Sequence, residues 1–152
     1  MKLFSKKRKD KGFSLVELIV VVAIMAVLIG VLVPTLVRNV EKSKHQKDIS
    51  AVEEIRNAMQ IALASEEFST IEVTLTATGG TVNVSGLTAT NTTNSTDTIN
   101  KFLKEVCQNV NSTDTFSLEY SSKLNDENTK TIFTIANEKA QFSVESTEYG
   151  TE

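Results

Sequence analysis

The sequence predicts an α+β protein: one long N-terminal helix followed by a small antiparallel β-sheet head that packs on it. Two observations predict this class. A helical pattern runs from Phe13 to about Ser65, and the residues after Glu67 are rich in Thr, Ser, Asn and β-branched side chains, which favour strands and turns. At 152 residues the chain has the usual length of one domain, so its divisions must be argued from composition.

Charge is distributed unevenly along the chain. Residues 2–11 carry six Lys or Arg and one acid, whereas residues 48–152 carry six Lys or Arg and sixteen acids. The formal net charge of −3 therefore combines a basic amino-terminal tip with an acidic body. Because phosphate binding requires clustered cations, nucleic acid is not an expected partner of the acidic head.

The first predicted element is a membrane helix. Twenty consecutive uncharged residues, LIVVVAIMAVLIGVLVPTLV, fill positions 18–37. As a helix they would rise roughly 30 Å, which matches the hydrocarbon core of a bilayer. A buried core helix is the alternative, but such helices usually carry a polar face and this segment has none. No A-x-A-like site follows the run, which separates it from an ordinary secretory signal, whereas a signal anchor stays possible.

Glu17 is the residue that distinguishes this segment from a plain anchor. A charge within a membrane helix costs about 2.5–3.5 kcal/mol at the bilayer centre and less near the interface, so it needs a partner. No cation follows Glu17 until Arg38. A cut between Gly12 and Phe13 would create a positive α-amino group at the same depth. An axial offset between neighbouring subunits would bring that amine to another chain's carboxylate.

Residues 11–18, K-G-F-S-L-V-E-L, resemble the signature of the type IV pilins and pseudopilins, a family whose basic leader precedes Gly, Phe, a hydroxyl residue, two apolar residues and Glu. The resemblance implies that a prepilin peptidase cuts after Gly12 and methylates the new amino terminus on Phe13, and that Glu17 is the assembly carboxylate. Ser14 stands where Thr is common. The match is close over residues 6–40 and covers only the general architecture beyond them.

The resemblance also implies partners and a location. Before assembly the chain would cross the cytoplasmic or inner membrane once, in contact with lipid, with its head outside. It would then join copies of itself in a helical filament, through an inner-membrane assembly platform and its ATPase. The expected function is that of a subunit of an extracellular type IV pilus for adhesion, surface motility or DNA uptake. A pseudopilin of a type II secretion or competence machine shares the amino-terminal features, and a signal-anchored surface binding or sensor protein is the alternative of another class.

Gly30 and Pro34 predict a kink in the helix. The proline ring removes one backbone donor and crowds the carbonyl of Gly30, which is itself a weak helix former. The pair therefore marks a local bend or melted turn. Filaments of the resembled family unwind near a comparable proline, which implies that the same segment loosens on assembly.

Four segments follow from these patterns: a cleaved leader at 1–12, an apolar helix at 13–37, an amphipathic half at 38–67 and the head at 68–152. In the amphipathic half, apolar residues recur every three or four positions and predict a face packed on the head. A basic cluster at its start could meet lipid head groups or acidic neighbours, or simply form a solvated face. The apolar positions are Val40, Ile49, Val52, Ile55, Met59 and Ala62 or Leu63, and the basic cluster is Arg38, Lys42, Lys44, His45 and Lys47.

In the head, two short extended runs, 71–76 and 81–84, flank Gly79-Gly80 and predict an irregular hairpin or an extended loop. Residues 88–98 have almost no apolar content and predict an exposed loop. A short helix is expected from Thr98 to Val110, capped by Asp97. Three alternating segments, around Phe116–Tyr120, Ile132–Ala136 and Ala140–Val144, complete a meander of three or four strands. This arrangement matches the αβ-roll of pilins in outline.

No catalytic set or cofactor site emerges from the sequence. Cys107 is the only cysteine and His45 the only histidine, so an intramolecular disulfide and a Cys/His zinc site are both excluded. Cys107 falls near the apolar face of the predicted short helix and is interpreted as a small hydrophobic residue. We therefore expect a substrate of an enzyme rather than an enzyme, with no cofactor and no metal. The nearest approach to a calcium loop lacks the D-x-D-x-D-G arrangement and is interpreted as a solvated turn: Asp114, Asp126, Glu127 and Asn128.

Overall fold

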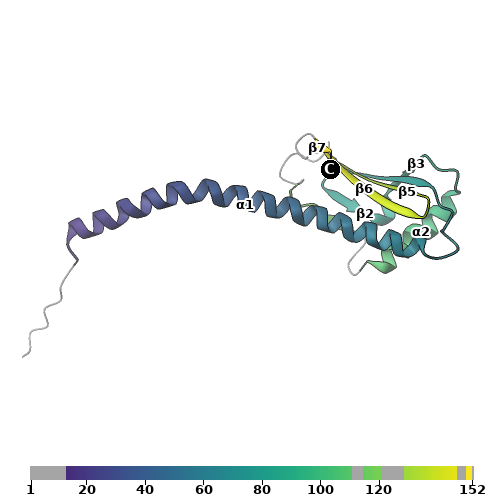
Figure 1. The fold of residues 1–152 in the computed structure, drawn as a ribbon, viewed down its shortest axis with the longest axis horizontal. Helices are drawn as coiled ribbons and strands as arrows, with labels where there is room; N and C mark the ends of the chain where they lie inside the picture. Colours follow the sequence, from purple (N-terminus) through teal and green to yellow (C-terminus); the bar gives the residue numbers. More distant parts are fainter. Residues whose placement is uncertain (1–12, 111–114, 121–128, 147–149, 152) are drawn as a thin grey trace, which may run out of the picture. The chain divides into compact units, whose positions relative to one another are not determined.

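The structure is a computed structural model that describes residues 13–110, 115–120, 129–146 and 150–151 (Figure 1). It contains two compact units, of which the first ends at Val40 and the second begins at Glu41. The elements, in chain order, are α1 (Leu15–Leu63), β1 (Val73–Thr78), β2 (Thr81–Asn83), the 3-10 helix η1 (Val84–Gly86), β3 (Thr88–Thr90), α2 (Thr96–Asn109), β4 (Thr115–Ser117), β5 (Lys130–Ala136), β6 (Lys139–Ser146) and β7 (Gly150–Thr151).

The first unit consists of the amino-terminal part of α1 and the two residues before it. Every described side chain in this unit is exposed, including its large apolar ones. One 18-residue window of α1 has a mean hydropathy of 3.1 with none of it buried. Among the described residues, α1 is the one helix long and apolar enough to cross a membrane. Val40, predicted to face the core, is 46% exposed, because the buried face of α1 begins only at Asp48.

The second unit has a single hydrophobic core, and α1 supplies one side of it. Val52, Ile55 and Met59 are fully buried in that core, as the sequence periodicity predicted. They pack with side chains from the inner face of the sheet, such as Leu75 and Phe133. Burying one such side chain contributes about 1.5–3 kcal/mol, so the core of this unit can stabilise it without partners.

The head contains two antiparallel sheets rather than one meander. The larger has five strands in the order β3-β1-β5-β6-β7, and the smaller pairs β2 with β4. In the larger sheet Leu75 lies opposite Phe133, and Phe133 opposite Phe142, so one face is apolar and turned to the core. The α+β class, with a long helix followed by a small antiparallel sheet, is confirmed.

The predicted hairpin at Gly79-Gly80 is wrong, because β1 and β2 belong to different sheets. The Gly79 N–H donates to the Thr129 carbonyl at 2.7 Å and extends the β1–β5 pairing, whereas the Gly80 carbonyl accepts from the Leu118 N–H at 2.7 Å beside β4. Gly79 has a φ of 96°, a conformation that favours glycine. The two glycines therefore carry the chain from one sheet to the other.

Two further expectations for the head need correction. The segment predicted as an exposed loop at 88–98 begins with β3, an edge strand that pairs with β1. The short helix starts at Thr96 rather than Thr98, and its N-cap is Ser95, whose hydroxyl accepts from the Thr98 N–H at 3.2 Å. Asp97, the predicted cap, instead lies in the first turn, where its charge favours the helix dipole.

The apolar face predicted for the short helix is confirmed. Ile99, Phe102, Leu103 and Val106 are buried. The Phe102 ring meets the Phe68 ring edge to face, with centroids 5.5 Å apart. Cys107 is half-buried and packs against the same core, which agrees with its interpretation as a small hydrophobic residue.

Candidate processing and assembly site

The predicted cut lies at the edge of what the structure describes. Gly12 lies outside the described residues, whereas Phe13 and Ser14 precede α1, which begins at Leu15. The Phe13 side chain is 88% exposed. The residue expected to become the amino terminus therefore stands just before the first helical turn, with its side chain uncovered by the rest of the chain.

Glu17 lies in the first turn of α1 and already has a hydrogen-bond partner. Its Oε2 accepts from the Ser14 backbone N–H at 2.9 Å. The sequence S-L-V-E is the S-x-x-E capping pattern, in which the glutamate three residues after the cap binds the cap's own N–H. The positive end of the helix dipole also favours a carboxylate in this turn. Glu17 therefore has a backbone donor as its partner before the cut, although no cation follows it in the sequence until Arg38.

The helix remains continuous through Gly30 and Pro34. Pro34 has no N–H, so the Gly30 carbonyl lacks its usual donor four residues later. One residue further along, the Thr35 hydroxyl donates to the Val31 carbonyl at 3.4 Å, a bond that often accompanies helix bending. A Cβ at Gly30 would meet nothing within 4 Å, so no contact within the described chain requires glycine there. A melted turn is absent from this state, and loosening on assembly stays a prediction.

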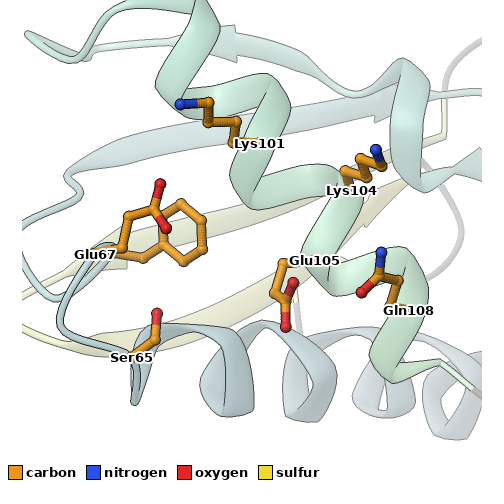
Figure 2. Close-up of a pocket in the computed structure, with 7 residues that line it drawn as sticks. Ser65, Glu67, Lys101, Lys104, Glu105 and Gln108 are labelled. Carbon is orange, nitrogen blue, oxygen red and sulfur yellow. The ribbon is translucent and has the colours of Figure 1, made fainter.

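A shallow pocket of the second unit lies beside α2 (Figure 2). Lys101 and Lys104 are on α2 and Glu67 lies after the end of α1, so both signs of charge border it. Its other lining residues are Ser65, Phe68, Glu105 and Gln108. Within the described ranges, no group of three or more His, Cys, Asp and Glu could hold a metal ion. The acidic residues considered for calcium, from Asp114 to Asn128, lie outside the described residues.

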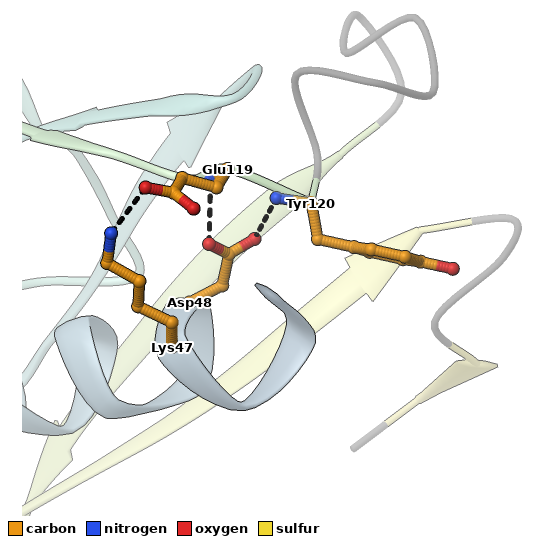
Figure 3. A network of polar contacts seen from close by, with 4 residues as sticks. All are labelled: Lys47, Asp48, Glu119 and Tyr120. Carbon is orange, nitrogen blue, oxygen red and sulfur yellow. Dashed lines mark hydrogen bonds and ion pairs between the residues drawn. The ribbon is translucent and has the colours of Figure 1, made fainter. Parts of the chain in front are cut away.

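A polar network fastens α1 to the segment after β4 (Figure 3). The buried Asp48 carboxylate accepts from the Glu119 N–H at 2.6 Å and from the Tyr120 N–H at 2.8 Å. The Lys47 ammonium donates to the Glu119 carboxylate and forms an ion pair with it. This hydrogen bond, together with the positive charge of Lys47, lowers the pKa of Glu119. His45 adds an edge-to-face contact with the Tyr120 ring, with centroids 5.7 Å apart.

Sequence reasoning assigned Lys47 and His45 to a basic cluster and missed Asp48. A signal for Asp48 was present, because it lies four residues before Val52 on the apolar stripe of α1. A carboxylate on such a stripe must be paired when it is buried. A second missed residue is Gln60, whose side-chain amide donates to the Glu138 carbonyl at 2.8 Å and accepts from the Ala140 N–H at 3.0 Å. It fastens the β5–β6 turn to α1.

Comparisons with known proteins agree with this site. A family model described as the prokaryotic N-terminal methylation motif matches residues 7–33, which include Gly12, Phe13, Glu17 and Gly30. The chain therefore carries a match to this methylation motif at the start of a long apolar helix. The resemblance to type IV pilins and pseudopilins, first drawn from residues 11–18, is confirmed.

Particular relatives are similar over part of the chain. Type II secretion system core protein G of Aeromonas hydrophila is 36% identical over 73 residues, which cover 47% of this chain and 51% of the relative. Core protein G of Escherichia coli is 40% identical over 53 residues, 35% of this chain and 37% of the relative. Prepilin peptidase-dependent protein A of Clostridium perfringens is 31% identical over 84 residues, 54% of this chain and 60% of the relative.

These similarities are partial. The chain spans about half the length of the first curated relative and 38% and 37% of the next two. No solved structure matches the chain. The comparisons therefore support the amino-terminal motif directly and leave the head to be understood from its own structure.

Proposed function

We propose that the chain is a prepilin subunit that is cut after Gly12, methylated on the Phe13 amine and polymerised through its N-terminal helix. The observation that carries this proposal is the start of α1. Glu17 sits in the first turn, with its carboxylate accepting from the Ser14 N–H, next to Phe13 and directly before an apolar segment that no described part of the chain covers. Such a helix end supports a role in both processing and assembly.

The cut changes the charge at this helix end. Hydrolysis of the Gly12–Phe13 bond leaves a carboxylate on Gly12 and an α-amine on Phe13, and an α-amine titrates near pH 7.7–8.0, so it is largely cationic at neutral pH. Methylation keeps that charge. Glu17, held first by the Ser14 N–H, then gains a stronger charged partner. In a filament this partner is the amine of an axially displaced neighbour, which fixes the register between two helices.

The apolar segment supplies contact area between neighbouring subunits, but it does not fix their alignment along the helix axis. Lipid tails are as apolar as the side chains of residues 18–37, so exchanging lipid for a neighbouring helix gains little hydrophobic free energy. Packing and the few polar groups must then decide how subunits align. This is why we assign Glu17 the role of assembly carboxylate. Gly30 and Pro34 are the proposed place where the helix adjusts, because one backbone hydrogen bond is already missing there.

The proposed partners follow from these steps. They are a prepilin peptidase for the cut and the methylation, membrane lipid before assembly, and copies of this chain afterwards. The name of the Clostridium perfringens relative states dependence on prepilin peptidase. An inner-membrane assembly platform and its ATPase complete the proposal, since extracting an apolar helix from a bilayer requires work. The head would lie outside the membrane throughout.

Two destinations fit such a subunit. The names of the core protein G relatives support a pseudopilus of a type II secretion machine. The outer face of the larger sheet supports an extracellular pilus, because it is rich in threonine, with Thr74 opposite Thr90 and Thr134. Electron microscopy of cells with and without this chain, combined with a secretion assay, separates the two. Loss of external fibres supports the pilus, and loss of secretion alone supports the pseudopilus.

Substitutions at Glu17 test the assembly role. Glu17→Val removes the charge and the hydrogen bond, whereas Glu17→Gln keeps an acceptor for the Ser14 N–H and removes only the charge. We expect both variants to insert and to be cut, and both to form at least tenfold fewer filaments. A tenfold change in an association equilibrium corresponds to about 1.4 kcal/mol, which is the order of magnitude that one lost charge pair can supply. Sheared filaments and the mass of the mature chain are measured together.

The two variants distinguish the possible roles. Normal filaments from Glu17→Gln but not from Glu17→Val would show that Glu17 acts only as a helix cap. Normal filaments from both would remove its role in assembly. Gly12→Leu is the matched control for processing: its leader should remain attached, because a peptidase needs close access to the backbone at the scissile bond, and normal cutting of this variant would contradict the proposed site.

A further inference from the structure

The exposed face of α1 in the second unit carries charges that are sorted along the helix axis. Lys42, Lys44 and Lys47 lie within two turns, and Glu53 and Glu54 follow one to three turns later. Lys42, Lys47, Glu53 and Glu54 are exposed, and Lys44 is half-buried. One end of this face is therefore basic and the next part is acidic.

These charges are poorly compensated within their own helix. A helical ion pair needs opposite charges three or four residues apart. Glu54 has no cation at those spacings and Lys42 has no acid, while Arg38 lies four residues before Lys42. Arg56 lies three residues after Glu53, yet no described residue forms an ion pair with Glu53, Glu54 or Lys42. Glu41 and the buried Asp48 flank the basic stretch, and Lys47 binds Glu119, so Lys42 is the exposed lysine of this stretch without an ion pair among the described residues.

A parallel copy shifted along the axis would compensate both charge groups. Six to twelve residues separate the lysines from the glutamates, and these spacings correspond to a shift of roughly 9–18 Å at the usual helical rise. A copy displaced toward the carboxyl end of α1 brings its lysines level with its neighbour's glutamates. A shift in the same direction brings its Phe13 amine toward its neighbour's Glu17.

We propose that the exposed face of α1 between Lys42 and Ile61 is a contact surface for a second, axially shifted copy of this chain, with the lysines of one copy against Glu53 and Glu54 of the other. This contact rests on the proposed function, which it deepens by naming the surface that sets the register outside the membrane segment. It is independent of Glu17, because it uses charges of the second unit alone.

The shape of the same face suits a helical neighbour. Its middle is formed by small or short polar residues, among them Ser43, Ser50 and Asn57, which are exposed and allow close approach of another backbone. Ile61 is 61% exposed and is the one large hydrophobic side chain left exposed in the described part of the second unit. An exposed isoleucine beside charged side chains fits a protein interface, in which an apolar core is surrounded by a polar rim.

Charge-reversal cycles in the full-length chain test the contact. Lys42→Glu, Glu53→Lys and Glu54→Lys are made singly, and Lys42→Glu is then combined with each glutamate variant. Matched controls carry the same reversals away from the face, Lys101→Glu on α2 and Glu72→Lys before β1, both at exposed positions. Leader removal, chain abundance and sheared filament mass are measured for each variant, so that a folding or processing defect is recognised by its loss of mature chain.

We expect Lys42→Glu and at least one glutamate reversal to lower filament mass about tenfold, since like charges at an interface oppose association. One double variant should recover to within roughly threefold of wild type, and which one recovers reports the register. The controls should assemble normally.

Other outcomes overturn the contact in distinguishable ways. If only Lys42→Glu is impaired and no double variant recovers, the lysines bind an anionic membrane surface instead. Normal assembly of all single variants removes the contact and leaves the proposed function intact. A wild-type chain that is cut but never polymerises contradicts the proposed function as well.

Discussion

The two units of this chain differ in the burial of their apolar residues. In the second unit, Phe102, Phe133 and Met59 are fully buried by other parts of the same chain. In the first unit, residues of equal hydrophobicity, such as Leu28 and Ile29, are more than half exposed. The first unit therefore leaves its apolar side chains uncovered by the described part of the chain, whereas the second unit buries its apolar side chains in a core of its own.

The largest expected effect comes from separating the units. A chain that starts at Lys42 should be soluble and monomeric without detergent, and the full chain should partition into membranes, because every exposed large hydrophobic residue within the described ranges except Ile61 belongs to the first unit. Size-exclusion chromatography with light scattering measures the difference. Aggregation of the shortened chain would contradict the proposed independence of the head.

A buried aromatic residue tests the same comparison by substitution. Phe102→Ala should lower the free energy of unfolding of the head by about 3–5 kcal/mol, since it removes a fully buried ring that packs on Phe68 and leaves a cavity. Urea denaturation of the full chain in detergent measures this loss. Leu28→Ala is the matched control in the first unit and should leave the transition unchanged. An equal loss of unfolding free energy from both substitutions would contradict the difference in burial between the two units.

Asp48 gives a smaller effect within the second unit. Asp48→Ala should lower the free energy of unfolding by about 1–3 kcal/mol, because the N–H groups of Glu119 and Tyr120 lose their acceptor. Asp48→Asn keeps one acceptor oxygen and should lose less. Faster hydrogen exchange at those two amides is the accompanying signature. Unchanged exchange in the alanine variant would mean that the segment after β4 is held by other contacts.

The smallest expected effect is the pH dependence of the Lys47–Glu119 pair. The pKa of Glu119 is lowered below its ordinary value of 4.5, so the pair stabilises the fold above that pH, and the contribution is lost as the pH falls through the folded-state pKa. The stability difference between wild type and Lys47→Met should therefore shrink on acidification below about pH 4.5. The pair is exposed and its effect should be modest, as for surface ion pairs in general. A stability difference that grows on acidification would contradict the stabilising effect assigned to the Lys47–Glu119 pair.

The elements with a strong repeating pattern were predictable from the sequence. The second half of the long helix, the short helix and the two strands of the β5–β6 hairpin each bury one side, and their periods of 3.6 and 2 indicate it directly. Ser14 and Glu17 were also readable as a helix start, although the bond between them was overlooked. In each case the signal was local, so a few neighbouring residues were enough.

The features that were missed depend on contacts between distant residues. β3 has exposed threonines at both ends and a half-buried alanine, so only its pairing with β1 identifies it as a strand. The exchange of sheets at Gly79-Gly80 is decided by Thr129 and Leu118, which are far along the chain. Asp48 and Gln60 take their roles from backbone groups more than 70 residues away. Local periodicity carries no information about such partners.

The mature amino terminus is the most direct test of the account. Mass spectrometry of the chain isolated from membranes should find a methylated Phe13 as the first residue and no leader. A signal-anchored surface binding or sensor protein would keep its leader, so a retained Met1 on the mature protein would contradict the proposed cut, the charge that the cut creates beside Glu17, and the polymerisation that depends on it.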